Sequence, residues 1–450
     1  MIRIANGQGF WGDSVDAPVR LMREGPLDVL TLDYLAEVTM SIMQKLKRRD
    51  PAGKSGYATD FVELIRTILP DLREKGTRVV ANAGGVNPRA CLAAVSRVAR
   101  DGGAAGMKIG MVAGDDILDR LDRIMAEGVP LSNMDDGRPL SEIREKVVSA
   151  NVYMSAFPIA EALNLGAQIV LTGRSTDPGL VVGPLIHRYG WNRDDWDRLA
   201  AGTVAGHIIE CGAQCTGGNF SRWWEVEGWD HLGYPIVEVE PDGSFVVTKH
   251  AGTGGLVTVD TVAEQLCYEM GDPCSYVTPD VIADFGSIQL GQQGVDRVGV
   301  SGVKGRPRTD SLKVSISYLA GYSAIGQLTI SGPQPIEKAK VAAAALWGRL
   351  RRAGLEYAET HTELAGAGAC HGRIAQGGSP AEVVLRLGVK DPDQKKVDRF
   401  GKEIAPLVTT GPPGVTGFAG GRPRANEVIA FWPALIPREM VKAEVRVESV

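Results

Sequence analysis

A histidine and a glutamate stand three positions apart in a glycine-rich stretch of the chain, at His207 and Glu210. If the chain is helical from His207 onward, both side chains share one face with Cys211 and Cys215. A neighbouring carboxylate favours the charged form of histidine, which suits proton transfer near neutral pH. The same face would also allow a zinc site or a Cys–His nucleophile, or the thiols simply pack as small apolar groups. We favour acid/base use of His207 or Glu210 and expect no metal, because no further ligand spacing accompanies them.

A second candidate is the segment 172–178, which follows the apolar run 168–171. Arg174 in this segment is able to clamp a carboxylate or a phosphate through two parallel hydrogen bonds. Asp177 is able to act as a general base or to orient one. The alternative is structural, with Asp177 capping a helix that begins at Pro178. Our catalytic candidates are Asp177, His207 and Glu210, and Arg174 is a ligand-binding candidate.

The first glycine cluster has the spacing of a dinucleotide-binding loop. Gly7, Gly9 and Gly12 follow the apolar run 2–5 and precede a predicted helix. Backbone N–H groups at such a turn favour a phosphate or a carboxylate. Asp33 ends the next predicted strand, where an acid would bind a ribose in a dinucleotide fold. The alternative is a tight turn without a cofactor, but we expect some ligand at this loop.

Other glycine and polar residues follow predicted strands or flank the histidine segment. Asn82, Gly84 and Gly85 come after the run 78–81, and Asn87 beside them fits a helix cap. The Asn82 side chain and the glycine pair are not explained by a cap, so we assign them to ligand binding. A lysine in a later glycine-rich loop is placed to meet a phosphate, such as that of coenzyme A. The remaining ligand-binding candidates are Gly217, Gly218, Asn219 and Lys249.

These candidates need a scaffold, and the N-terminal part of the chain predicts one by alternating strands with helices. The predicted strands are residues 2–5, 28–32, 78–81, 107–112 and 168–172. The predicted helices are residues 14–24, 36–47, 60–75, 89–101 and 156–165. This alternation favours a parallel sheet covered on both faces. Because the carboxyl ends of parallel strands share one edge, we expect the strand-end loops to converge on one pocket.

The rest of the chain has a different pattern. Two short apolar runs, 235–240 and 244–248, flank a Pro-Asp-Gly turn and predict a hairpin. The last third predicts strands at 311–319, 324–331, 382–387, 428–432 and 443–447 and helices at 337–353 and 394–408. We predict an α/β fold with a doubly wound, mostly parallel N-terminal domain and an α+β C-terminal domain. The expected segments are 1–200, a middle segment 201–305 that completes the site, and 306–450.

Composition excludes several classes of protein. The 450 residues carry 49 Lys and Arg against 54 Asp and Glu, a net charge of −5. A chain so near neutral has no electrostatic reason to bind nucleic acid or an anionic membrane. No long apolar run or signal-like start is present, and the six cysteines lack a C-x-x-C pair. We expect a cytoplasmic homo-oligomer with reduced thiols that acts on a small molecule.

Several of these segments together resemble the acyclic terpene utilisation (AtuA) family. The resemblance spans most of the chain and follows the same order of segments. The matching segments are Gly12-Asp13, Asp33–Glu37, Asn82–Gly85, Asn87-Pro88, Thr172–Arg174, Asp177-Pro178, Ala205–His207, Glu210–Gln214, Thr216–Gly218, Gly252–Gly255, Glu264-Gln265 and Asp272-Pro273. The resemblance implies a role in breaking down branched acyclic terpenoids such as citronellol and geraniol through coenzyme A thioesters.

The leading hypothesis is a catabolic enzyme that hydrates, dehydrates or hydrolyses a branched or cyclic acyl-CoA. Such chemistry needs a carboxylate or histidine for proton transfer and N–H donors for the enolate or oxyanion. We expect no cofactor, with coenzyme A as part of the substrate. One alternative is an NAD(P)-dependent oxidoreductase, which rests on the first glycine loop and Asp33. The other is a non-catalytic subunit of an acyl-CoA carboxylase-like assembly.

Overall fold

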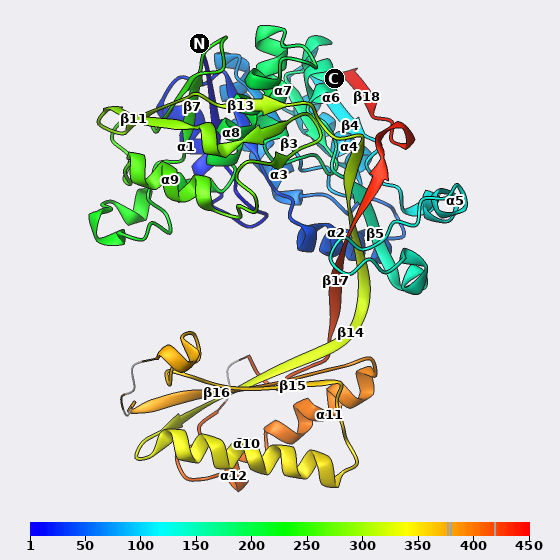
Figure 1. Ribbon diagram of the computed structural model, residues 1–450, viewed down its shortest axis with the longest axis vertical. Coiled ribbons are helices and arrows are strands. Elements are labelled where there is room, and N and C mark those ends of the chain that lie inside the picture. Colours follow the sequence, from blue (N-terminus) through cyan, green and yellow to red (C-terminus); the bar gives the residue numbers. More distant parts are fainter. Residues whose placement is uncertain (376–377, 379, 418–419) are drawn as a thin grey trace. The chain divides into compact units, whose positions relative to one another are not determined.

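The computed structural model describes residues 1–375, 378, 380–417 and 420–450 (Figure 1). The chain divides into two compact units, one of residues 1–317 with 431–450 and one of residues 318–430. The boundaries predicted from the sequence lie at 200/201 and 305/306. Each unit is described by itself.

The first unit is built on a ten-stranded sheet with a parallel centre. The strand order is β11-β12-β8-β7-β1-β2-β3-β6-β4-β18. The central parallel strands are β1 (Ile2–Asn6), β2 (Val29–Leu32), β3 (Arg78–Ala81), β6 (Ile169–Thr172) and β4 (Lys108–Ala113). All five were predicted, because each is a short, almost continuously apolar run between turn residues.

Antiparallel strands extend this centre on both sides, so the sheet as a whole is mixed rather than mostly parallel. The added strands are β7 (Ile236–Val239), β8 (Phe245–Thr248), β12 (Arg297–Ser301) and β11 (Gln289–Gly294) beside β1, and β18 (Glu444–Ser449) beside β4. The β7–β8 pair is the predicted hairpin. A separate three-stranded sheet contains β9 (Tyr276–Val277), β10 (Ile282–Asp284) and β13 (Lys304–Arg306).

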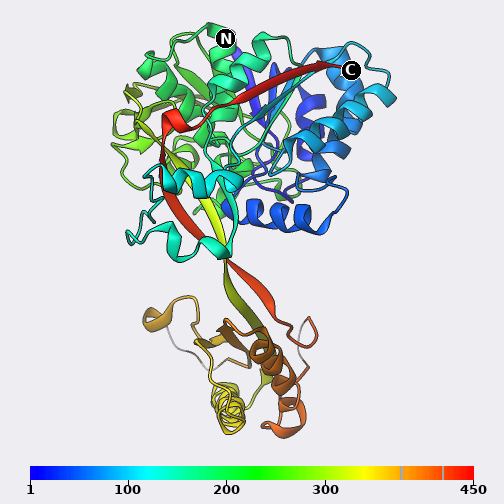
Figure 2. The same ribbon diagram turned by 90° about the vertical axis from the view of Figure 1, so that its right-hand side faces the viewer.

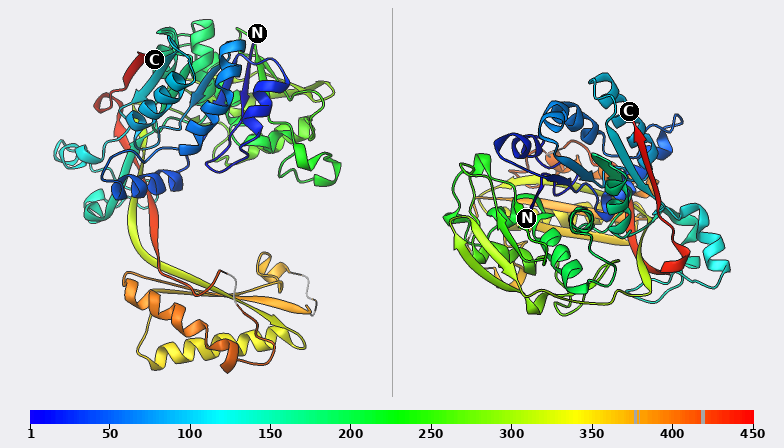
Figure 3. Two further views of the ribbon diagram at one scale, coloured as in Figure 1. Left: turned by 180° about the vertical axis from the view of Figure 1, so that it is seen from behind. Right: turned by 90° about the horizontal axis from the view of Figure 1, so that it is seen from above.

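Helices cover both faces of the large sheet and enclose two apolar cores (Figures 1 and 3). One layer contains α1 (Ala17–Glu24), α2 (Glu37–Arg49), α3 (Thr59–Lys75) and α4 (Pro88–Asp101). The other contains α6 (Phe157–Asn164), α7 (Gly179–Tyr189), α8 (Trp196–Ile209) and α9 (Val259–Cys267). Right-handed crossovers explain this division. The chain moves along the sheet in one direction through β1, β2, β3 and β4 and then turns back to β6, so the helices before and after this reversal lie on opposite faces. The short α5 (Leu121–Ala126) follows β4.

The second unit is an antiparallel sheet with its own core (Figure 2). Its sheet order is β15-β16-β14-β17, with β15 (Glu359–Ala365), β16 (Glu382–Asp391), β14 (Ser311–Ser331) and β17 (Asn426–Pro437). Its helices are α10 (Pro335–Arg352), α11 (Gln394–Ile404) and α12 (Leu407–Thr410). In the first unit, β5 (Val147–Val152) pairs with β14.

Two predictions for the last third need correction. The separate strands expected at 311–319 and 324–331 form one strand, β14. The helix expected over 394–408 ends at Ile404, and a short second helix follows. Among the described residues, no helix has the length and apolar character needed to cross a membrane.

Candidate functional site

A cavity of about 940 Å³ opens in the first unit at the carboxyl ends of the central strands. The loops after β1, β2 and β6 all contribute to its wall, as do residues 210–219 after α8 and residues 268–279. The expected convergence of strand-end loops is therefore present for three of these strands. The loop after β3 contributes none of the lining residues.

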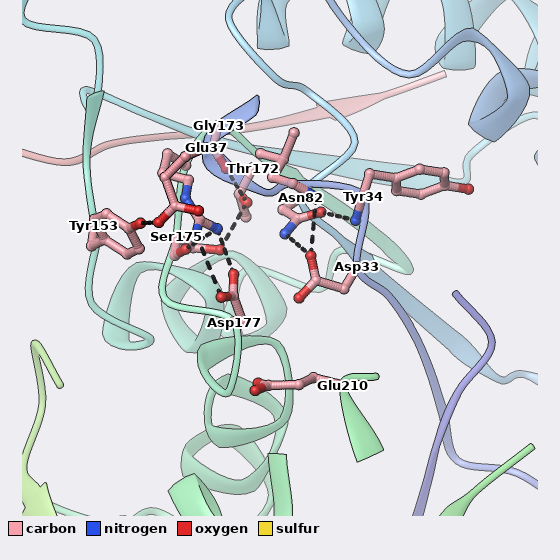
Figure 4. Close-up of polar contacts among 12 residues, drawn as sticks. Asp33, Tyr34, Glu37, Asn82, Tyr153, Thr172, Gly173, Ser175, Asp177 and Glu210 are labelled. Atoms are coloured by element: carbon pink, nitrogen blue, oxygen red, sulfur yellow. Dashed lines mark hydrogen bonds and ion pairs between the residues drawn. The ribbon is translucent and has the colours of Figure 1, made fainter. Parts of the chain in front are cut away.

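Asp33 stands at the end of β2 and lines this cavity (Figure 4). The Asn82 side chain donates to Asp33 Oδ1 at 2.6 Å, and the backbone N–H of Leu35 donates to the same oxygen at 3.1 Å. Burial raises the pKa of Asp33 well above its ordinary value, and the negative charges of Asp177 and Glu210 raise it further. Because Oδ1 already accepts two hydrogen bonds, the proton of neutral Asp33 belongs on Oδ2.

Arg174 follows β6 and is only 2% exposed. Its guanidinium donates to both carboxylate oxygens of Asp177, one of them at 3.4 Å, and its Cζ lies 4.2 Å from the centre of the Tyr153 ring. Burial opposes the charge of Arg174, but Asp177 outweighs it, so the pKa of Arg174 lies above its ordinary value. The guanidinium is thus already paired with an acid of the same loop. Asp177 does not cap α7, whose N-cap position is Pro178.

Glu210 and His207 form a hydrogen-bonded pair at the end of α8. His207 Nδ1 lies 3.2 Å from Glu210 Oε1, and His207 Nε2 lies 3.1 Å from the backbone oxygen of Gln265. A carbonyl only accepts, so Nε2 carries a proton and Nδ1 and Oε1 share another. Burial lowers the pKa of His207, but its contacts with Glu210 outweigh burial and the net pKa is raised. Glu210 lines the cavity, whereas His207 lies behind it.

The predicted helical face from His207 to Cys215 is not present. Helix α8 ends at Ile209, Gly212 has a φ of +60°, and a 3-10 turn occupies Gly212–Thr216. Both His207 nitrogens are occupied, and burial raises the pKa of Cys211 to about 12, so its thiol stays neutral. The pair therefore does not support a Cys–His nucleophile. Among the residues the structure describes, no group of three or more His, Cys, Asp or Glu side chains is arranged to hold a metal.

An acid–phenol pair in the cavity was not predicted from the sequence. Glu37 is the first residue of α2, and its Oε1 accepts a hydrogen bond from the Tyr153 hydroxyl. Lys313 Nζ lies 3.9 Å from the same oxygen. Burial raises the pKa of Glu37, but the Tyr153 hydrogen bond and the charge of Arg174 outweigh it, so the net pKa is lowered. In the sequence, only the position of Glu37 four residues after Asp33 could have indicated this pair. No local pattern marks Tyr153 or Lys313.

Several large apolar side chains are exposed at the rim of the cavity. Five large side chains that line it are also between 38% and 58% exposed: Phe10, Met134, Tyr268, Val277 and Leu435. Exposed apolar residues gathered at one opening are typical of a ligand site. The cavity therefore combines a carboxylate-rich wall with an apolar entrance.

The predicted catalytic and ligand-binding residues divide into two groups. Those that line the cavity are Gly9, Asp33, Arg174, Asp177, Glu210, Gly218 and Asn219. Those that do not are Gly7, Gly12, Asn82, Gly84, Gly85, His207, Gly217 and Lys249. Asn82 positions Asp33 instead, and Lys249 Nζ donates to the backbone oxygen of Thr253 at 2.9 Å and lies 3.0 Å from Asp296. Lys249 therefore does not offer the cavity a free charge for a coenzyme A phosphate.

The glycines have packing roles that the sequence did not separate from ligand binding. A Cβ on Gly9 would lie 2.7 Å from the backbone nitrogen of Gly212, and one on Gly84 would lie 2.5 Å from the carbonyl oxygen of Thr172. Gly12 faces open space, and α1 begins only at Ala17. This geometry differs from the dinucleotide-binding loop, where the third glycine packs the helix against the strand.

Comparison with known families gives one match. A family model described as "Acyclic terpene utilisation family protein AtuA" matches residues 2–447, nearly the whole chain. No curated protein matches the chain.

Proposed function

Because the chain belongs to the acyclic terpene utilisation family, whose name indicates terpene catabolism, we propose that it is an enzyme that adds water to, or removes it from, a branched acyl thioester. The observation that supports this reaction is a pair of buried carboxyl groups with raised pKa values, Asp33 and Glu210, in one cavity. Figure 4 shows Asp33, Asp177 and Glu210 around a common space.

The two carboxyl groups take opposite protonation states in this proposal. Burial and nearby carboxylates raise the pKa of Asp33 and so favour its neutral form, and we assign it as the proton donor. Burial also raises the pKa of Glu210, but His207 opposes this by hydrogen bonding and charge. The charged form of His207 therefore supports an ionised Glu210, which is the base. His207 is a positioning residue, because it acts through Glu210.

In the hydration direction, Glu210 removes a proton from water as the water oxygen bonds to the β-carbon of an enoyl thioester. The electron pair of the double bond moves toward the thioester carbonyl, and Asp33 gives the α-carbon its proton. The elimination of water runs the same steps in reverse. Two carboxyl groups in different environments are an established way to divide acid and base roles.

The test is turnover of a branched enoyl thioester, measured as the loss of the ultraviolet absorbance of its conjugated double bond. We expect Asp33→Asn and Glu210→Gln each to lower kcat by about 100-fold or more, because each removes a titrating group while keeping its shape. His207→Asn should lower kcat less and should move the acidic limb of the pH profile.

Matched controls are Asp119→Asn and Glu145→Gln, which change exposed acids outside the cavity lining. Wild-type turnover in Asp33→Asn and Glu210→Gln would contradict the proposal. So would equal losses in the control variants. Thermal melting of every variant separates loss of chemistry from loss of folding.

A further inference from the structure

The charge of the cavity wall is strongly one-sided. The acidic side chains that line it are Asp13, Asp33, Glu37, Asp177, Glu210 and Glu269. The basic ones are Arg174 and Lys313. At neutral pH this wall is negative even with one carboxyl group protonated, so it opposes entry of an anion.

Both cations already have partners. Arg174 is paired with Asp177, and Lys313 lies near Glu37 and 4.9 Å from the centre of the Tyr153 ring. An incoming carboxylate would have to displace Asp177 to gain Arg174, and at Lys313 it would meet the Glu37 carboxylate, 3.9 Å from the ammonium. Displacing Asp177 would also leave that acid without its partner, which is costly because the Arg174 side chain is buried.

One further acceptor lies at the wall without a hydrogen bond. Glu210 Oε2 is buried and has no partner in the structure. A ligand that donates a hydrogen bond, such as water, stabilises an ionised oxygen of this kind, whereas a ligand with a second negative charge destabilises it. The apolar rim formed by Phe10, Met134, Tyr268, Val277 and Leu435 favours a hydrocarbon chain at the entrance.

We propose that this cavity accepts a branched acyl chain only as an uncharged derivative and rejects the corresponding free carboxylate. The inference rests on the proposed function, because it names the form of the acyl group at the same site. The anionic nucleotide end of coenzyme A stays outside the acidic wall, so a shortened thioester binds nearly as well as the complete one.

The test is isothermal titration calorimetry on the full chain with three probes that share one branched chain. They are geranate, the N-acetylcysteamine thioester of geranic acid and geranoyl coenzyme A. Because of the charge of the wall, we expect geranate to bind at least about tenfold more weakly than the short thioester at low salt. Added salt should strengthen geranate binding severalfold through screening, with little effect on the short thioester.

A charge reversal at the rim sharpens the test. Glu269 is exposed and lines the cavity, so Glu269→Lys should raise the affinity of geranate relative to the short thioester by about fivefold. Glu145→Lys makes the same change away from the cavity and should leave this ratio unaltered.

The inference and the proposed function fail separately. Binding selectivity without turnover of any thioester would support the inference and contradict the proposed reaction. Equal affinity for geranate and the short thioester would overturn the inference, whatever the turnover. Absence of binding by all three probes would overturn it as well.

Discussion

At the residue scale, Asn82 shows how a buried amide influences the proposed acid, Asp33, without lining the cavity. Its Nδ2 donates to Asp33 Oδ1, and its Oδ1 accepts from the backbone N–H of Tyr34 at 2.7 Å. The donated hydrogen bond favours the ionised form of Asp33 and so lowers its pKa against the larger effect of burial. Asn82 is therefore one of the groups that set the pH at which Asp33 loses its proton.

We predict that Asn82→Ala moves the activity profile toward higher pH. Without the amide donor, the pKa of Asp33 rises further, so the proton donor persists to higher pH. The basic limb of kcat against pH should shift upward, and stability should fall by about 1–3 kcal/mol because the Tyr34 N–H loses its acceptor. The measurement is the pH profile of turnover together with urea unfolding.

Asn87→Ala on the same loop is the control. Asn87 Oδ1 caps α4 by accepting from the backbone N–H of Ala90 at 3.3 Å, and the loss of such a cap costs about 1 kcal/mol. It should reduce stability and leave the basic limb in place. An unmoved limb in Asn82→Ala would show that this amide does not tune Asp33.

Asp33 and Asp177 were predicted from the sequence to lie near one pocket, whereas their supports were not. Asp33 directly follows β2 and Asp177 lies in the loop after β6, so the rule that parallel strands end at one edge was enough to bring them together. Asn82 and Lys249 looked equally available for a ligand, but their partners come from other parts of the chain. A single sequence does not show which polar residue is already satisfied.

At the element scale, the loop after β1 packs directly on the turn that follows α8. Gly9 is the contact point, because a Cβ there would lie 2.8 Å from the carbonyl carbon of Cys211 and still closer to Gly212. Since Glu210 immediately precedes this turn, movement of the turn would displace the proposed base.

We predict that Gly9→Ala lowers both stability and turnover. The added methyl group has no room, so the loop or the turn must shift, at a cost of about 1–3 kcal/mol. Gly291→Ala is the control, because nothing lies within 4 Å of a Cβ there. Thermal melting and kcat should fall in the first variant and not in the second. An undisturbed Gly9→Ala protein would refute this contact.

Short buried strands were predicted well because apolar runs between turn residues specify them locally. Helix α8 was not recognised, and its glycines explain why. Gly206 looks like a helix breaker, yet a Cβ there would lie 2.6 Å from the Cα of Pro178, so the glycine permits close packing onto the start of α7. Gly321 lies between the two strands that were expected at 311–319 and 324–331. In the structure it has a φ of +120° and lies inside the continuous strand β14.

At the scale of the whole molecule, the first unit is assembled from both ends of the chain. Strand β18 pairs with β4, and Leu435 lines the cavity. Pairing between such distant segments leaves no local signature, so a single sequence does not show that residues 431–450 belong with residues 1–317.

The stability of the first unit should depend on pH through the ionisation of one buried carboxyl group, which lies just beyond the carboxyl end of β4. Asp115 follows β4, and its Oδ2 accepts from the Asn151 side chain and from the backbone N–H of Arg174, both at 2.8 Å. Burial raises the pKa of Asp115 from its ordinary value of 3.8 to about 6. The folded protein therefore holds this proton more tightly than the unfolded chain does.

The contribution of Asp115 is consequently greatest below about pH 4 and is lost as the pH rises through about 6, a decrease of about 3 kcal/mol by linkage. We predict that Asp115→Asn removes this decrease, since the amide oxygen still accepts hydrogen bonds but does not ionise.

The measurement is urea unfolding between pH 4 and 7, monitored by tryptophan fluorescence. This signal reports mainly on the first unit, because Trp347 is the one tryptophan in residues 318–430. The free energy of unfolding of the wild type minus that of the variant should fall with rising pH, whereas Asp119→Asn, a change at an exposed site, should give a constant difference. A constant difference for Asp115→Asn as well would mean that Asp115 is already ionised in the folded protein at pH 4.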